Sequence, residues 1–320
     1  MKVISSSGQE SIATVFLAEM PNSRIIEFLE SVQPPYPREK KWVLIVSTLY
    51  GCPVKCPICD AGGGYQGKLT EDEIFTQIDF LIKRRYPDFH IPAEKFKIQF
   101  ARMGEPSFNM AVLDILEKLP FRYNAPGLMP CISSVAPSVS DRFFDRLLDI
   151  KEKHYRGRFQ LQFSIHSTDE KERDFLIPVK KWSFEKIAEY GRRYFKNGDR
   201  KITLNFAPSQ SSVIDVDVLK QHFDPELFFI KITPINPTYR AEKSGLSSYI
   251  DPAQKDYKYA LIESLRTAGY EVLLSIGETA ENQIGSNCGQ YITQHLKEIK
   301  YKNSIDDSYT SPLREYIETC

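Results

Sequence analysis

The sequence predicts an α/β fold: an open, partial (βα)6 barrel preceded by a β-hairpin. Apolar strand-like runs alternate with amphipathic helical segments from Trp42 to Ser275, which is the pattern of a parallel sheet with crossover helices. Polar motifs follow directly after most of these runs, as they do at the mouth of such a barrel. A length of 320 residues, with 42% hydrophobic residues, is enough to bury the core of one domain of this kind.

The N-terminal part of the chain predicts a hairpin rather than a βα unit. Residues 12–20 and 24–32 favour strands, and Pro21-Asn22-Ser23 between them has the composition of a turn. Residues 33–41 contain three prolines and are expected to form a linker. We therefore expect three parts, which are the hairpin and linker at 1–41, the partial barrel at 42–291, and a C-terminal helix and tail at 292–320.

The barrel elements follow from periodicity and from capping residues. Thr70 and Glu73 have the spacing of a capping box, which opens the clearest helix. The predicted strands are 42–46, 96–101, a third ending at 131–134, 159–163, 201–206, 228–232, and a last short one at 270–275. The predicted helices are 70–84, 111–119, 141–151, 184–195 and 253–268.

A cysteine-rich loop follows the first predicted barrel strand. Cys52, Cys56 and Cys59 have the spacing C-x3-C-x2-C. A cubic four-iron cluster takes four ligands, so three thiolates from one loop leave one iron open for chemistry. A zinc knuckle and a set of buried thiols are the alternatives. Zinc would need a fourth ligand, and the next Cys or His along the chain is His90.

Several polar residues lie at the ends of the other predicted strands. In parallel α/β folds the loops at the carboxyl ends of the strands converge, so these residues are expected to gather beside the cysteine loop. They are Gly104 and Glu105, Ser133, the run Ser164-Ile165-His166, and Asn236.

Composition limits the class of partner and the compartment. Lys+Arg and Asp+Glu are equal, at 42 each, so no overall basic field indicates nucleic acid. The other cysteines, at 131, 288 and 320, are too scattered for a secreted disulfide framework. The chain has no signal-peptide pattern and no membrane-length apolar run. We expect a soluble protein of the reducing cytoplasm.

These motifs together resemble one family, the radical S-adenosylmethionine (SAM) RNA adenine methyltransferases of the RlmN and Cfr type. The resemblance covers about residues 12–291 and rests on several motifs in one order. In chain order these motifs are Glu30-Ser31-Val32, the cysteine loop with its following Gly-Tyr, Met103-Gly104-Glu105-Pro106, Ser133-Ser134, Ser164-Ile165-His166, Arg173 with Ile177-Pro178, Pro234-Ile235-Asn236-Pro237, and Asn287-Cys288-Gly289-Gln290.

The resemblance implies cofactors and roles for individual residues. It implies a [4Fe-4S] cluster on the three cysteines and SAM on its open iron, cleaved to a 5′-deoxyadenosyl radical. Cys288 matches the cysteine that carries a methyl group from one SAM to the adenine, and Glu30 matches a proposed proton acceptor on that base. The residues that would hold SAM are Gly104, Glu105, Ser133, Ser164, Ile165, His166 and Asn236.

Two departures from the family affect these expectations. The family has a second catalytic cysteine, which resolves the covalent adduct, and Ile45 stands at that position here. Cys131 lies two residues before Ser133 on a strand, so it projects to the same face and is a conceivable substitute. The family also carries an RNA-recognition domain before the hairpin, whereas this sequence starts at the hairpin.

We therefore expect a radical SAM enzyme that modifies a carbon centre, by methyl transfer to an adenine-like or other substrate. An electron donor such as flavodoxin or ferredoxin is implied, and strong RNA binding is not expected. The alternatives are a radical SAM enzyme with non-methylating chemistry on a small molecule, and a non-catalytic iron-sulfur or zinc module. Cleavage of SAM would separate the enzymes from the binding module.

Overall fold

A single curved sheet of ten strands organises the molecule. The computed structural model describes residues 1–254 and 257–291, and the strand order is β1-β2-β3-β4-β7-β8-β9-β10-β11-β12. Edge strands β1 and β12 are not joined, so the barrel is open, as predicted. The antiparallel strands are β1 (Lys2–Gln9), β2 (Ala13–Glu19) and β3 (Ile25–Val32). The parallel strands are β4 (Lys41–Val46), β7 (Lys95–Phe100), β8 (Leu128–Ser134), β9 (Gln160–Ser164), β10 (Ile202–Phe206), β11 (Phe228–Ile232) and β12 (Val272–Leu274).

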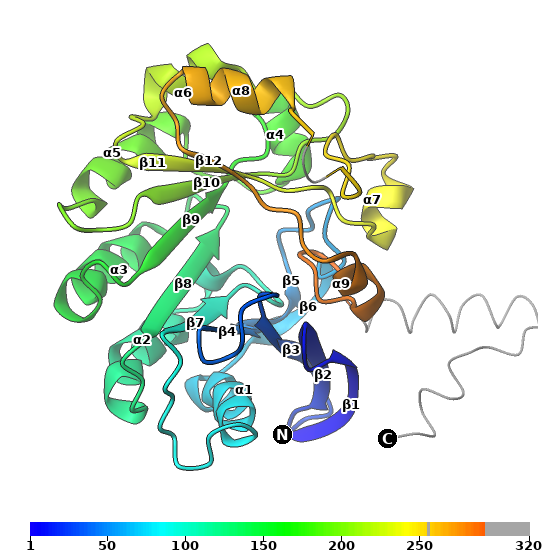
Figure 1. Cartoon of the computed structure of the whole chain (residues 1–320), viewed down its shortest axis with the longest axis vertical. Helices are drawn as coiled ribbons and strands as arrows, with labels where there is room; N and C mark the ends of the chain where they lie inside the picture. Colours follow the sequence, from blue (N-terminus) through cyan, green and yellow to red (C-terminus); the bar gives the residue numbers. More distant parts are fainter. Residues whose placement is uncertain (255–256, 292–320) are drawn as a thin grey trace, which may run out of the picture.

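The helices between the parallel strands cover the outer face of this sheet. Figure 1 shows α1, α2, α3 and α5 along that side. Helix α1 begins after the predicted capping box, since Thr70 and Glu73 bond each other's backbone N–H groups. The helices are α1 (Glu71–Lys83), α2 (Ala111–Arg122), α3 (Asp141–His154), α4 (Glu170–Leu176), α5 (Phe184–Tyr194), α6 (Val216–His222), α7 (Tyr239–Lys243), α8 (Ala260–Thr267) and α9 (Thr279–Ile284), and Pro106–Phe108 forms the 3-10 helix η1.

The main apolar core lies between the sheet and its helices. Strand β4 alternates half-buried and buried residues, and the buried ones, such as Trp42 and Leu44, belong to this core. Strand β7 alternates in the same way. The inward residues of the strands are only half-buried, so the inner face of the sheet stays available for a site.

The predicted hairpin is part of the same sheet. Strand β3 pairs antiparallel with β4, in register from Leu29 with Ile45 to Val32 with Trp42. The predicted division at residue 41 therefore marks a change of strand direction within one sheet. Strand β1 was not predicted, because its Ser-rich sequence carries little strand propensity.

The structure also differs from the prediction elsewhere. The helix expected at 253–268 begins only at Ala260, because the Asp251 carboxylate accepts N–H groups from Ala253 and Gln254 and holds a turn there. A small hairpin of β5 (Leu49–Cys52) and β6 (Gly63–Lys68) was not predicted. The predicted C-terminal helix and tail, 292–320, lie outside the described residues.

Candidate active site at the carboxyl edge of the sheet

The cysteine loop is closed at its base by the β5–β6 hairpin. Cys52 lies at the end of β5 and pairs with Gly63 of β6. Gly51 has a φ of +72°, and a Cβ at this position would lie 2.6 Å from the carbonyl oxygens of Gly63 and Gly64. Only glycine fits there, so the two strands can approach closely and bring the ends of the loop together.

The three thiols of this loop are half-buried and close to one another. Backbone N–H groups of the loop and of Glu105 donate to the Cys52 sulfur. Burial raises the pKa of Cys52 to about 11 and that of Cys56 to about 12, and neighbouring cysteines add to the effect for Cys56. Thiolates at these positions therefore need a compensating positive charge, which a metal or an iron-sulfur core would supply.

Arg240, on helix α7, holds the loop from the other side. Its guanidinium donates to three backbone carbonyls of the loop. The acceptors are the oxygens of Lys55 at 2.8 Å, Cys56 at 3.0 Å and Gly62 at 3.3 Å. The loop shape is thus fixed by protein contacts that involve no cysteine side chain.

Asp60 continues this attachment at the end of the loop. Its carboxylate accepts the backbone N–H groups of Arg240 at 3.0 Å and Tyr239 at 3.3 Å. Its own N–H donates to the carbonyl of Gly289 at 2.8 Å. Asp60 therefore ties the cysteine loop both to α7 and to the segment that contains Cys288.

The Cys288 segment lies across the same edge of the sheet. The Asn236 amide donates to the Cys288 carbonyl at 2.9 Å. Gly289 has a φ of +84°, and a Cβ there would lie 2.7 Å from the Ile58 carbonyl. The predicted Asn236, the predicted Cys288 and the cysteine loop are therefore neighbours, and the Cys288 side chain is exposed.

A buried ion pair fixes this segment against the hairpin strands. Arg102 follows β7 and donates to the Glu27 carboxylate and to the Gly285 carbonyl, both at 2.9 Å. Its guanidinium also lies 4.5 Å from the centre of the Tyr291 ring. Sequence reasoning missed both charged residues, because a single Arg or Glu beside a strand carries no signal of burial.

Gly104 and Glu105 contact the cysteine loop through their backbone. Gly104 has a φ of +103°, and a Cβ there would lie 2.5 Å from the Leu49 side chain. The Glu105 carboxylate points inward and accepts hydrogen bonds from the hydroxyls of Ser134 at 2.6 Å and Ser107 at 2.7 Å. Burial raises the pKa of Glu105, and these hydrogen bonds oppose that rise. Its side chain anchors the end of β8 and leaves the backbone facing the loop.

Ser133, Ser164 and His166 lie at the ends of β8 and β9, as predicted. Ser133 and Ser164 are half-buried, whereas Ile165 is fully buried. The Nδ1 atom of His166 accepts the Ala207 N–H at 3.2 Å, which places its proton on Nε2. Burial, together with the nearby Arg173 guanidinium, lowers the pKa of His166 to about 4. The ring is therefore neutral near pH 7.

Comparisons with known proteins agree with the fold. No protein-family model matches the chain. A protein named "Probable dual-specificity RNA methyltransferase RlmN" from Rhodococcus opacus is 26% identical over 286 residues, covering 83% of this chain and 71% of the relative. A protein of the same name from Chlorobium phaeobacteroides is 24% identical, covering 84% and 72%. The fold also matches the crystal structure of a radical SAM methyltransferase from Sphaerobacter thermophilus, with a TM-score of 0.68 at 18% identity. This match covers 91% of the present chain and 81% of the Sphaerobacter chain.

Over most of its length the chain is similar to proteins named as RlmN RNA methyltransferases, and its fold is similar to that of a radical SAM methyltransferase. Ile45 packs in a small apolar cluster with Leu29 and Ile284, on the inner face of the sheet. Cys131 is fully buried, and the Gln162 amide donates to its sulfur at 2.9 Å. Its role as a substitute thiol stays a prediction.

Glu30 occupies a different environment from the other predicted residues. Its carboxylate accepts hydrogen bonds from Arg85 at 2.8 Å and from the Trp42 indole at 2.9 Å. In the β3–β4 pairing Glu30 lies opposite Leu44, on the face that α1 covers. The buried Glu27 carboxylate, in contrast, lies near Tyr291, as Cys288 does. A catalytic role for Glu30 stays a prediction.

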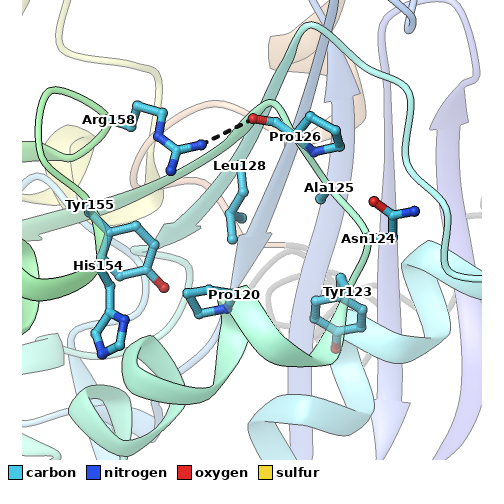
Figure 2. A pocket seen from close by; sticks show the side chains of 9 residues that line it. All are labelled: Pro120, Tyr123, Asn124, Ala125, Pro126, Leu128, His154, Tyr155 and Arg158. Atoms are coloured by element: carbon cyan, nitrogen blue, oxygen red, sulfur yellow. Dashed lines mark hydrogen bonds between the residues drawn. The ribbon is translucent and has the colours of Figure 1, made fainter.

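Two surface hollows lie beside different strands. One, of about 260 Å³, is next to the cysteine loop and is lined by residues that include Asp60, Met103 and Tyr291. The other, shown in Figure 2, lies beside the start of β8, where Arg158 donates to the Pro126 carbonyl at 3.2 Å. It includes no predicted site residue.

Two wider searches cover the described residues, 1–254 and 257–291. Within them, no three His, Cys, Asp or Glu side chains gather closely enough to hold one metal ion. A four-iron cluster is held differently, since each thiolate bonds its own iron. None of the described helices is long and apolar enough to cross a bilayer.

Proposed function

We propose that this protein is a radical SAM methyltransferase that holds a [4Fe-4S] cluster on Cys52, Cys56 and Cys59 and acts on a carbon centre. The observation that carries the proposal is the meeting of the cysteine loop and Cys288 at one edge of the sheet, through Asp60 and Gly289. The relatives named as methyltransferases share most of the chain. An enzyme with this cluster would work in a reducing compartment, which we take to be the cytoplasm, with a flavodoxin or ferredoxin as donor.

The residues around the loop fit such a cluster. Three thiols from one loop leave one coordination position open. Val54, Leu176 and Ile177 form an apolar cluster against Cys52 and Cys56, and such a shell restricts water at a metal site. When bound, the cluster supplies the electron that cleaves the sulfonium of SAM to a 5′-deoxyadenosyl radical.

Neighbouring polar groups would hold SAM at the open position. The backbone of Gly104 and Glu105, the hydroxyls of Ser133 and Ser164, and the Asn236 amide provide short, fixed hydrogen-bond partners for its amino-acid and ribose groups. Neutral His166 would donate from Nε2. Ile165, being buried, would contribute packing and its backbone.

Cys288 would accept a methyl group from a first SAM. The Cys288 sulfur would form the new carbon–sulfur bond as the methyl–sulfonium bond breaks, S-adenosylhomocysteine would leave, and the thiol proton would pass to solvent. The exposed side chain of Cys288 suits this exchange. Cys288 would then present this methyl group to the 5′-deoxyadenosyl radical, which would take one hydrogen atom from it to form 5′-deoxyadenosine before the carbon bonds to the substrate. Breaking the bond between that carbon and the Cys288 sulfur would need a further thiol.

A second candidate is radical chemistry without a methyl carrier on a small molecule. The observation that favours it is Ile45, an isoleucine in an apolar cluster at the position of the family's second catalytic cysteine. The third alternative, a non-catalytic iron-sulfur or zinc module, would leave SAM intact.

The test is SAM cleavage by anaerobically purified, reduced protein. About four irons per chain and formation of 5′-deoxyadenosine are expected, and the Cys56→Ala variant should lose both. Lys55→Asn is the matched control, since this exposed side chain belongs to the same loop and Asn tolerates its left-handed φ of +63°. Stoichiometric zinc without iron, or an iron-loaded protein that leaves SAM intact, would contradict the proposal.

A further inference from the structure

The inner face of the sheet is polar along several neighbouring strands. Pairing registers place Gln162 of β9 opposite Thr203 of β10, and Asn205 of β10 opposite Lys231 of β11. Lys97 of β7 projects to the same side. In a sheet covered by helices on its other face, such a row of polar side chains requires either water or a ligand as a partner.

A cavity of about 720 Å³ lies against this face. That volume is within the roughly 300–1,000 Å³ of small-molecule sites. The cavity begins at the amino ends of the strands, near Lys41 and Arg200, and extends along the sheet to the segment Ser275–Glu281. It therefore runs toward the edge where Cys288 lies.

Six cations line this cavity against four carboxylates, Asp199, Glu271, Glu278 and Glu281, so the lining has an excess of positive charge. Two of its carboxylates already have partners, because Glu271 pairs with Lys201 at 2.7 Å and Asp199 pairs with Lys151. Within the described part of the chain, the ammonium groups of Lys95, Lys97 and Lys231 have no hydrogen-bond or ion-pair partner. The cations that line the cavity are Lys41, Lys95, Lys97, Arg200, Lys201 and Lys231.

These lysines repel one another. Burial, together with the neighbouring Lys95, Lys97 and Lys231, lowers the pKa of Lys41 to about 8. Burial, with Lys97 nearby, also lowers the pKa of Lys231. Unpaired ammonium groups that lie this close together destabilise the protein without a bound anion, because they repel one another and are partly removed from water. An anion that neutralises them would remove this destabilisation.

Lys231 connects the cavity to the proposed reaction site. It lies in one cross-strand row with Asn205 and Ser164, the latter being a proposed SAM ligand. It is also close enough to Cys288 and Cys131 for their charges to influence it. The Asn205 Oδ1 atom is buried and has no hydrogen-bond partner among the described residues, so a donor on a bound molecule could complete this row.

We propose that this cavity binds the phosphate group of a small-molecule substrate, with Lys97 and Lys231 as its main contacts, while the rest of the substrate extends toward Cys288. A phosphate monoester carries nearly two negative charges and three acceptor oxygens, so it can pair with several lysines at once. A single carboxylate brings one charge. The position of the reacting carbon rests on the proposed function, whereas the anion site does not.

The test measures anion binding to the cluster-loaded full chain under anaerobic conditions, by calorimetry and by the melting temperature. Inorganic pyrophosphate is the phosphate probe and citrate the carboxylate probe, each at a constant ionic strength set with chloride. Pyrophosphate should bind and raise the melting temperature. Lys97→Met and Lys231→Met should each weaken its binding about tenfold or more, whereas Lys97→Arg, which keeps the charge, should retain it.

Lys196→Met removes an equally positive but exposed side chain and should bind pyrophosphate as the wild type does. Without anion, Lys231→Met should melt at the same temperature as the wild type or higher, because an unpaired buried charge has been removed. The proposal is overturned if citrate binds more tightly than pyrophosphate, if neither binds, or if the two Met variants bind normally. SAM cleavage without pyrophosphate binding would overturn the anion site alone. Pyrophosphate binding without SAM cleavage would overturn the proposed function alone.

Discussion

At the scale of single residues, the proposed chemistry depends most on Cys288 and Ile45. Asn236 and the cysteine loop hold the Cys288 backbone at the site. Ile45 instead packs on Leu29 and Ile284, and an isoleucine cannot form a disulfide with a methyl-carrying cysteine. Release of the product would need Cys131, an external thiol, or a route without a covalent adduct.

Mass spectrometry of protein incubated with labelled SAM separates these routes. We expect one labelled methyl group on Cys288, because its thiol is exposed beside the proposed SAM position, and none in Cys288→Ala. If the Cys131→Ala variant forms no product while Cys288 is still methylated, Cys131 is the thiol that releases the product. If Cys288 carries no label and the Cys288→Ala variant still converts substrate, the reaction does not transfer a methyl group through Cys288.

At the scale of elements, the short helix α7 acts as a support for the cysteine loop. Arg240 occupies three loop carbonyls, and the Thr238 hydroxyl donates to the Ile58 carbonyl at 3.3 Å. These contacts link parts of the chain about 180 residues apart. The thiols are therefore held in place by protein contacts, which would lower the entropic cost of binding the proposed cluster.

We expect Arg240→Met to lower the iron content by about half or more after gel filtration, because loss of three charge-assisted hydrogen bonds frees the loop. Arg240→Lys should be intermediate, since one ammonium cannot reach three diverging carbonyls. Lys243→Met, an exposed change on the same helix, is the control. Visible absorbance reports the cluster and circular dichroism the fold. Wild-type iron content in Arg240→Met would show that the loop needs no support from α7.

At the scale of the whole molecule, charge is distributed unevenly although the totals balance. The 42 basic and 42 acidic residues cancel, yet a group of lysines faces the inner cavity rather than the outer surface. A basic interior attracts a small anion, whereas binding to a nucleic-acid backbone requires basic residues spread over an outer face.

We therefore expect weak binding of RNA. Fluorescence anisotropy with labelled transfer RNA and with a ribosomal RNA fragment, near physiological ionic strength, should give dissociation constants above about 1 µM. A salt titration serves as the control, because phosphate contacts weaken steeply as salt rises. Submicromolar, salt-sensitive binding would show that an outer basic surface exists and would point to RNA as the substrate.

Local patterns were sufficient to predict the parallel strands, the main helices and the cysteine loop. Each depends on neighbours in the chain, such as the alternation around Trp42, the capping box at Thr70, and the spacing of three cysteines in one loop. Because parallel strands end at one edge of a sheet, the sequence also indicated that Gly104, Ser164 and Asn236 would gather there.

Tertiary structure alone decided which charged residues are buried and where the cavity lies. Arg102 and Glu27, or Arg240 and Asp60, lie far apart in the chain, and nothing local distinguishes them from surface residues. Nothing in the sequence around Lys231 distinguishes it from an exposed lysine in a strand. Only the folded structure shows that it lines the inner cavity. The sequence by itself determined the parallel strands, the main helices between them and the cysteine loop, because these depend on local periodicity and spacing. Contacts between residues that are far apart in the sequence depend on how the strands pack together in the sheet. Only the folded structure therefore shows these contacts.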